Sequence, residues 1–188
     1  MKLVVFDGLD GCGKDTQAKL VFDYYAKKGK NVVLRSHPSK DNFFGRQSKA
    51  ALGRTGKLNK ALATVFFGAD AIRSVIKYSH RKDIDVLIFS RYVLAVMYLP
   101  SSIKEPVYKL VCKILPISKY MFFLDISPDV SLKRIKSRNE KEEMFENKEA
   151  MIECRQKAES VLYNWNVINA DGSVEEIASS IAAILEDE

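Results

Sequence analysis

The stretch FDGLDGCGKDTQ, residues 6–17, holds the strongest fold signal of this chain. It contains Gly8, four residues, then Gly13 and Lys14, which is the frame of a phosphate-binding loop. A short apolar run precedes the stretch and a segment of helical period follows it, so the loop would join a strand to a helix N-terminus. Backbone N–H groups converge on phosphate oxygens at such a junction, and Lys14 would reach the β- and γ-phosphates. A plain glycine turn is the alternative, which the strand–loop–helix context disfavours.

The residue after Lys14 departs from the usual motif, in which Ser or Thr places a hydroxyl on Mg²⁺. Asp15 stands there instead. Because carboxylates are hard oxygen ligands, we predict that Asp15 binds Mg²⁺, with altered geometry. Thr16 is expected at the α-phosphate or just behind it. Cys12 lies among convergent N–H groups that would lower the pKa of a thiol, although a small loop residue is the favoured interpretation.

Five apolar runs of strand character alternate with segments of helical period. Their continuous apolarity is typical of buried strands in a parallel sheet covered on both faces. The alternation predicts one doubly wound α/β domain over residues 1–188. The runs are residues 2–6, 31–35, 85–89, 120–125 and 165–169.

Capping signals predict several helix boundaries. A helix over residues 15–28 would end before Gly29, and Ser127 with Pro128 reads as an N-cap followed by a helix start. Ser173 and Glu176 form a capping box. The apolar face behind this box would consist of Val174, Ile177, Ala178, Ile181 and Ile184.

The composition is that of a soluble globular protein with an anionic partner. Thirty Lys and Arg against 24 Asp and Glu give a net charge of +6, which suits phosphate ligands or nucleic acid, or is simply a basic surface. Three cysteines without a CxxC pair predict neither disulfides nor a zinc site. Without a secretory signal or an apolar run of membrane-spanning length, we expect a cytoplasmic protein with no membrane partner.

Residues 134–149 are dense in charge and poor in apolar side chains. Taken alone, such a run is most simply a solvated helix face. The alternative is a lid whose cations reach a phosphate.

These segments together resemble the thymidylate kinases, a family of nucleoside monophosphate kinases. FDGLDGCGKDTQ is similar to the FEGxDGxGKxTQ stretch of that family, and the resemblance covers nearly the whole chain in the right order. The other matching pieces are FFGADAIRSV (66–75), IFSRY (88–92), YMFFLDISPDVSLKRIKSR (120–138) with EMFE (143–146), and NADGSVEEI (169–177).

The resemblance implies a parallel five-stranded sheet with helices on both faces, in a homodimer. It implies phosphate transfer from ATP, with Mg²⁺, to a nucleoside monophosphate, with dTMP as the favoured acceptor. Asp171 belongs to the loop beside the adenine. The ATP phosphates would be bound by Gly8, Leu9, Asp10, Gly11, Cys12, Gly13, Lys14, Asp15 and Thr16.

On the acceptor side, the resemblance implies that Asp10 faces the sugar or a metal-bound water. Arg91 would clamp the acceptor phosphate and Phe67 would stack on the base. His37 and Lys40, in the HPSK stretch (37–40), and Tyr98 complete the predicted acceptor site, with Lys40 where the family often has Arg.

The catalytic cations implied are Lys14, Arg91 and one lid arginine. Family members without an Arg after the Asp of the loop carry a catalytic arginine in the lid, and this chain has Gly11 at that position. The lid arginine would therefore be Arg134 or Arg138, which favours the lid interpretation of residues 134–149.

Several positions depart from the family pattern. Ser90 stands for an Asp near the metal, and we hypothesise that Asp15 compensates for it. Ala71 stands for the Arg that reads thymine, and Met144 for an Arg at the lid tip. Leu99 and Pro100 stand for Tyr-Gln, with Tyr98 one place away.

Because the base-reading residues are the less well preserved, two alternatives stay open. One is a kinase for another pyrimidine nucleotide or nucleoside. The other is a catalytically weak nucleotide-binding protein that contacts nucleic acid through its positive charge. Arg91 and the charged segment argue against the second, since they have little purpose without an acceptor phosphate.

Overall fold

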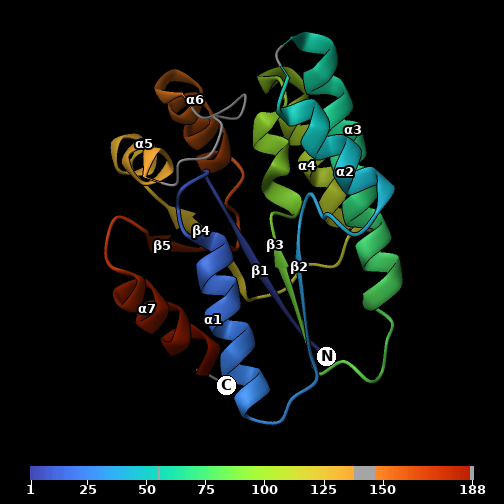
Figure 1. Ribbon diagram of the computed structural model, residues 1–188, viewed down its shortest axis with the longest axis vertical. Coiled ribbons are helices and arrows are strands. Elements are labelled where there is room, and N and C mark those ends of the chain that lie inside the picture. Colours follow the sequence, from blue (N-terminus) through green and yellow to red (C-terminus); the bar gives the residue numbers. More distant parts are fainter. Residues whose placement is uncertain (55, 138–146, 187–188) are drawn as a thin grey trace.

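The computed structural model describes residues 1–54, 56–137 and 147–186. Five strands form one parallel sheet in the order β2-β3-β1-β4-β5 (Figure 1). The predicted fold class is confirmed, and each strand lies within two residues of its predicted bounds. The strands are β1 (Lys2–Gly8), β2 (Val32–Ser36), β3 (Val86–Ser90), β4 (Met121–Asp125) and β5 (Asn166–Asn169).

Helices cover both faces of this sheet. The first and last helices, α1 and α7, pack beside each other in front of the sheet in Figure 1. Right-handed crossovers place the helices that follow β2, β3 and β4 on the other face. The helices are α1 (Lys14–Lys27), α2 (Phe43–Leu52), α3 (Lys57–Tyr78), the short 3₁₀ helix η1 (Val93–Tyr98), α4 (Ser101–Ile114), α5 (Pro128–Lys136), α6 (Lys148–Glu159) and α7 (Val174–Glu186).

The core lies around the three central strands. Residues 4–6, 87–89 and 122–124 are almost completely buried, as expected of parallel strands covered on both faces. The edge strands β2 and β5 are only partly buried. The prediction of five buried strands therefore holds for the centre of the sheet and is wrong for its edges, which have a neighbour on one side only.

The predicted helix boundaries are largely confirmed. Helix α1 ends at Lys27, and Gly29 follows with φ 73°. The Ser173 N–H donates to Glu176 Oε2 (2.8 Å) and the Glu176 N–H donates to Ser173 Oγ (3.2 Å), which is the capping box. Ser127 occupies the N-cap position before Pro128, without a side-chain cap bond.

The apolar face of α7 differs from the predicted one. Ile177 and Ile181 are buried, but Val174 is 43% exposed, and Leu185 is buried. Residues 177, 181 and 185 follow each other at intervals of four, so the contact stripe starts one turn later than predicted.

The topology brings three loops together at the carboxyl ends of β1, β2 and β3. The chain leaves β1 toward β2 on one side, and it crosses from β3 to β4 on the other. The carboxyl ends beside such a reversal form a crevice where ligands bind in open α/β sheets. Among the described residues, no helix combines the length and the apolarity that crossing a bilayer requires.

Candidate active site

A cavity of about 770 Å³ opens at this crevice, within the size range of small-molecule sites. Its lining comes from the end of β1 with the start of α1, from the loop after β2, from facing sides of α2 and α3, and from residues 91–98. The structure brings together there the predicted site residues Gly8, Asp10, Asp15, Thr16, His37, Lys40, Phe67, Arg91 and Tyr98.

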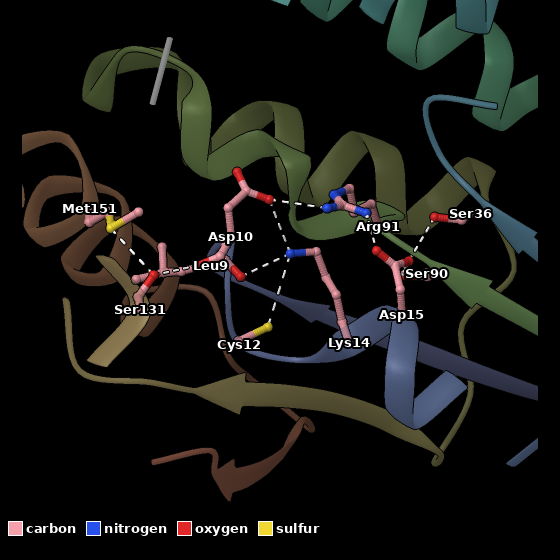
Figure 2. Close-up of polar contacts among 10 residues, drawn as sticks. All are labelled: Leu9, Asp10, Cys12, Lys14, Asp15, Ser36, Ser90, Arg91, Ser131 and Met151. Carbon is pink, nitrogen blue, oxygen red and sulfur yellow. Dashed lines mark hydrogen bonds and ion pairs between the residues drawn. The ribbon is translucent and has the colours of Figure 1, made fainter. Parts of the chain in front are cut away.

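The loop between β1 and α1 has the backbone shape that its glycines allow. Gly8 has φ 150°, and a Cβ there would lie 2.6 Å from the carbonyl oxygen of Leu124. Gly11 has φ 81°, and a Cβ there would lie 2.9 Å from the carbonyl oxygen of Ser131. The Ser131 hydroxyl also donates to the carbonyl of Asp10 (Figure 2). Helix α5 therefore buttresses the loop, and larger residues would not fit at either position.

Lys14 folds back over this loop. Its ammonium donates to the Leu9 carbonyl (2.8 Å) and to Asp10 Oδ1 (3.2 Å), and it lies 4.0 Å from Cys12 Sγ (Figure 2). The side chain is buried. Its charge is therefore held inside the loop, where phosphate oxygens would bind.

Arg91 lies beside Lys14 and is held by two carboxylates. One guanidinium nitrogen donates to Asp10 Oδ1 (3.1 Å) and another to Asp15 Oδ2 (2.8 Å). Burial would raise the pKa of Asp10, but the charges of Lys14 and Arg91 outweigh it and lower that pKa to about 2. The cluster thus sets two cations against two ionised carboxylates at the mouth of the loop.

Asp15 is also bonded on its other oxygen. Asp15 Oδ1 accepts from Ser36 Oγ (2.8 Å) and from Ser90 Oγ (2.7 Å) (Figure 2). Burial works against ionisation, but Arg91, Lys14 and these hydroxyls hold the pKa of Asp15 well below its usual range. Its carboxylate lies against Ser90, the position where the resemblance places an Asp. The hypothesis that residue 15 supplies the carboxylate absent from residue 90 gains geometric support.

Cys12 does not have the lowered pKa that its position among N–H groups suggested. The side chain is completely buried, and burial raises the pKa of the thiol despite the charge of Lys14. That expectation is wrong, and Cys12 behaves as a small loop residue.

The end of the cavity between α2 and α3 is lined by Phe67 and by side chains that the sequence analysis did not single out. Lys60, Ala63 and Thr64 share one face of α3 with Phe67, and Ser48 and Leu52 of α2 face them. Positions 60, 63, 64 and 67 have the spacing of one helix face, which is the signal that was missed. Ala71 is buried, and neither Ala71 nor Arg73 lines the cavity.

Arg134 and Asp171 lie together away from this cavity. The Arg134 guanidinium donates to the carbonyls of Ala170 (2.9 Å) and Gly172 (2.9 Å), in the loop that contains Asp171. Asp171 Oδ1 accepts from the Ser127 N–H (2.8 Å). Arg138 and Met144 lie outside the described residues, as does most of the predicted lid.

Asp7 is a further site residue that the sequence analysis missed. It lines the cavity yet is only 2% exposed, and its Oδ2 accepts from the N–H groups of Tyr92 (3.0 Å) and Leu94 (3.2 Å). Burial raises its pKa to about 6, against the effect of these two bonds. The available signal was a carboxylate inside an otherwise apolar buried strand.

The residues at the loop fit a magnesium ion that is bound partly through phosphates. In the part of the chain that the structure describes, no three His, Cys, Asp or Glu side chains gather into a metal cage. Magnesium does not need one, because it usually keeps several waters and takes one or two carboxylates plus substrate phosphates. Asp10 and Asp15 are carboxylates of this kind beside the phosphate loop.

Known proteins share both the sequence pattern and the fold. The thymidylate kinase family model matches residues 6–181. A probable thymidylate kinase of Methanococcus aeolicus is 30% identical over 197 residues, covering 99% of this chain and 96% of its own. A probable thymidylate kinase of Sulfurisphaera tokodaii is 29% identical over 189 residues, covering 98% and 95%.

Among solved structures, the thymidylate kinase of Candida albicans superposes with a TM-score of 0.77 over 98% of this chain and 91% of its own. Its sequence identity is 16%, so it supports the fold alone. Together with the family match over residues 6–181, the phosphate loop and the cation–carboxylate cluster lead to one assignment. This chain belongs to the thymidylate kinase family.

Proposed function

We propose that the protein transfers the γ-phosphoryl group of ATP to a pyrimidine nucleoside monophosphate, with dTMP as the main acceptor and dTDP as the product. One observation carries this proposal: Lys14 of the phosphate loop and Arg91 of the acceptor side bind the same carboxylate oxygen, Asp10 Oδ1. A site with adjacent cations for donor and acceptor phosphates suits phosphoryl transfer between two nucleotides. The probable thymidylate kinases among the relatives support dTMP as the acceptor.

On the donor side, Lys14 and the backbone N–H groups of residues 8–14 hold the ATP phosphates. Phosphoryl transfer depends on positioned charge more than on covalent chemistry. Asp10 and Asp15 hold Mg²⁺ directly or through its waters. When bound, the metal neutralises charge on the phosphate oxygens.

On the acceptor side, Arg91 holds the phosphate of the monophosphate and Phe67 stacks on its base. Lys40 adds a second cation near the acceptor phosphate, while His37 and Tyr98 shape the wall. Because Asp10 touches both Arg91 and Lys14, it fixes the separation between the acceptor phosphate and the phosphoryl group.

The adenine end and the lid complete the single domain of residues 1–188. Asp171 lies at the adenine side, in a loop that Arg134 ties down through its backbone carbonyls. With Arg134 so engaged, Arg138 is the better candidate for the cation of the lid over residues 134–149. Lid closure excludes water from the transfer.

A homodimer in the cytoplasm is the form we propose for the enzyme. Helix α3 exposes an apolar stripe of heptad spacing, made of Leu58, Leu62, Val65, Ile72 and Ile76. A second copy that covers this stripe would remove it from water. The three cysteines are free, as suits a reducing compartment.

Initial rates with ATP and a panel of acceptors test the proposal. The panel holds dTMP, dUMP and dCMP, with AMP and thymidine as controls. Turnover of the pyrimidine monophosphates alone supports it. Turnover of thymidine alone would instead indicate a nucleoside kinase, and calorimetric ATP binding without turnover would indicate a nucleotide-binding protein.

A further inference from the structure

The backbone at Arg91 has an unusual conformation. Arg91 has φ 58°, and Asn164 is the one other non-glycine residue with positive φ among those described. Long side chains rarely adopt this left-handed region, and they keep it only where the surroundings hold it. The surroundings of Arg91 therefore show what sets its position.

Bonds from neighbouring elements hold the turn on both sides of Arg91. Its own N–H donates to the carbonyl of Phe6 in β1 (2.9 Å). The N–H groups of Tyr92 and Leu94, one and three residues further on, both donate to Asp7 Oδ2. These hydrogen bonds thus fix the turn to the last residues of β1.

The carbonyl of Arg91 is held by His37. His37 Nδ1 lies 2.9 Å from this oxygen, and His37 Nε2 lies 2.9 Å from Ser74 Oγ. A carbonyl only accepts, so Nδ1 carries the hydrogen. Burial lowers the pKa of His37, so the ring is neutral and Nε2 accepts from the hydroxyl of Ser74. The tautomer and orientation of the ring are thereby fixed from α3.

We propose that Asp7 and His37 are positioning residues that lock the left-handed turn at Arg91 and so aim its guanidinium between Asp10 and Asp15. Both side chains are almost completely buried, at 2% and 1% exposure. They act on the acceptor phosphate through Arg91. This role rests on the proposed function, because it treats Arg91 as the clamp of the acceptor phosphate.

The first experiment is a double-mutant cycle of Asp7→Ala with Arg91→Ala. Misplacing a phosphate clamp by about 1 Å costs on the order of 10²-fold, so we expect Asp7→Ala to lower kcat/KM for dTMP by about that factor. The KM for ATP should stay near the wild-type value. In the Arg91→Ala background the same change should cost nothing further, whereas multiplied losses would overturn the proposal.

Asp7→Asn is the matched variant, because its amide oxygen can still accept the bonds from Tyr92 and Leu94. We expect it to retain most of the activity. A loss as large as that of Asp7→Ala would mean that the charge of Asp7 matters rather than its hydrogen bonds, which contradicts a positioning role.

A second pair of variants tests the role of His37. Its result can be interpreted even if Asp7→Ala does not fold. His37→Asn keeps an N–H donor near the position of Nδ1, and His37→Leu removes it. We expect the Leu variant to lose acceptor efficiency and the Asn variant to recover a large part of it, with both effects absent in the Arg91→Ala background. Equal losses in the two variants would overturn the proposal.

Calorimetric binding separates this inference from the proposed function. Arg91 meets the phosphate, so Asp7→Ala should weaken binding of dTMP and leave binding of thymidine unchanged. If the wild-type enzyme turns over no monophosphate, the proposed function fails while this comparison still tests the positioning role. If the enzyme is active but dTMP binding does not change in the variant, the positioning role alone fails.

Discussion

One carboxylate oxygen of Asp10, Oδ1, accepts hydrogen bonds from both Lys14 (3.2 Å) and Arg91 (3.1 Å). Two cations so close would repel each other without an anion between them. The shared oxygen keeps them adjacent and gives both a fixed direction. The proposed donor and acceptor halves of the site are therefore joined at a single atom.

Lys14→Ala should abolish phosphoryl transfer and leave the fold intact. The ammonium stabilises charge on the transferring phosphoryl group, and removing such a group typically costs on the order of 10²-fold or more in kcat. Lys19→Ala is a matched control, since Lys19 is on the same helix and pairs with Asp23 at the surface. Steady-state rates and circular dichroism test this, and near-normal turnover of Lys14→Ala would refute the phosphate-loop assignment.

The contact between Asp15 and Ser90 predicts that one carboxylate can serve from either position. Asp15→Ser restores the hydroxyl of a conventional loop, so it should keep part of the activity with a shifted Mg²⁺ optimum, although neither position then holds a carboxylate. Asp15→Ala supplies no oxygen ligand and should weaken the use of Mg²⁺ further. Ser90→Asp alone places two carboxylates in contact and should impair the enzyme. The double variant Asp15→Ser/Ser90→Asp should recover activity.

Mg²⁺ titrations of wild type and these variants test the exchange. Identical curves for wild type, Asp15→Ser and Asp15→Ala would show that Asp15 has no part in metal use. A double variant no better than Ser90→Asp alone would show that the two positions are not equivalent.

Burial raises the pKa of Asp7 from 3.8 to about 6, so the ionised form of this residue destabilises the native state. The native state binds the proton more tightly than the unfolded chain, so this residue lowers stability as pH rises from about 4 through 6. Asp7→Asn removes that cost. Above pH 6 the variant should gain up to about 3 kcal/mol over wild type, with almost no gain below pH 4. Urea unfolding of both proteins at several pH values measures the difference, and a gain that does not depend on pH would contradict the assignment.

At the scale of elements, α3 has three roles. Its outer stripe is exposed and apolar, and its inner face lines the cavity through Lys60, Ala63, Thr64 and Phe67. One turn further on, Asp70 accepts from the backbone and hydroxyl of Ser39 (both 2.6 Å). The same helix therefore shapes the proposed base site and anchors the loop after β2.

The inner face of α3 predicts weak discrimination among pyrimidine bases. The hydroxyl of Thr64 donates to the Lys60 carbonyl (3.0 Å) and that of Ser48 to the Ala63 carbonyl (2.9 Å), so their hydrogens are already used. Stacking on Phe67 accepts any flat base. A pocket that discriminates by shape does so by about 10- to 200-fold, so dTMP, dUMP and dCMP should differ by no more than about 200-fold in kcat/KM.

Measured kcat/KM values for the three monophosphates test this. Phe67→Ala provides the control, since loss of stacking should lower all three to a similar extent. Strict exclusivity for dTMP would reveal a polar base reader beyond the residues described here.

The sequence predicted those features whose signals are local. The strands, the phosphate loop and the capping box of Ser173 each depend on neighbouring residues, and they are where they were expected. The contact of Asp15 with Ser36 and Ser90 depends on the order β2-β3-β1, which no local pattern encodes. The bonds of Asp7 also depend on that order, because their donors, Tyr92 and Leu94, follow another strand; only the carboxylate within an apolar strand was a local signal for this residue.

At the scale of the whole molecule, the exposed stripe of α3 predicts assembly. Ile72 and Ile76 are 46% and 72% exposed although both are large and apolar. If the proposed homodimer forms through this stripe, Ile72→Asp should convert it to a monomer, which sedimentation velocity would detect. Leu20→Asp is the control, because Leu20 is 41% exposed on α1. A wild-type monomer at all concentrations would contradict the proposed homodimer.

The place of β1 at the centre of the sheet has a consequence for synthesis of the chain. β1 and its phosphate loop leave the ribosome before either strand partner, since Lys2 pairs with Val86 and Val5 pairs with Met121. Such long-range pairing is slow, because the chain loses the entropy of loop closure before the stabilising strand contacts form. ATP stabilises only a state that can bind it. We therefore expect nascent chains that end before β4 to gain no protection from ATP, although they already carry every residue of the loop.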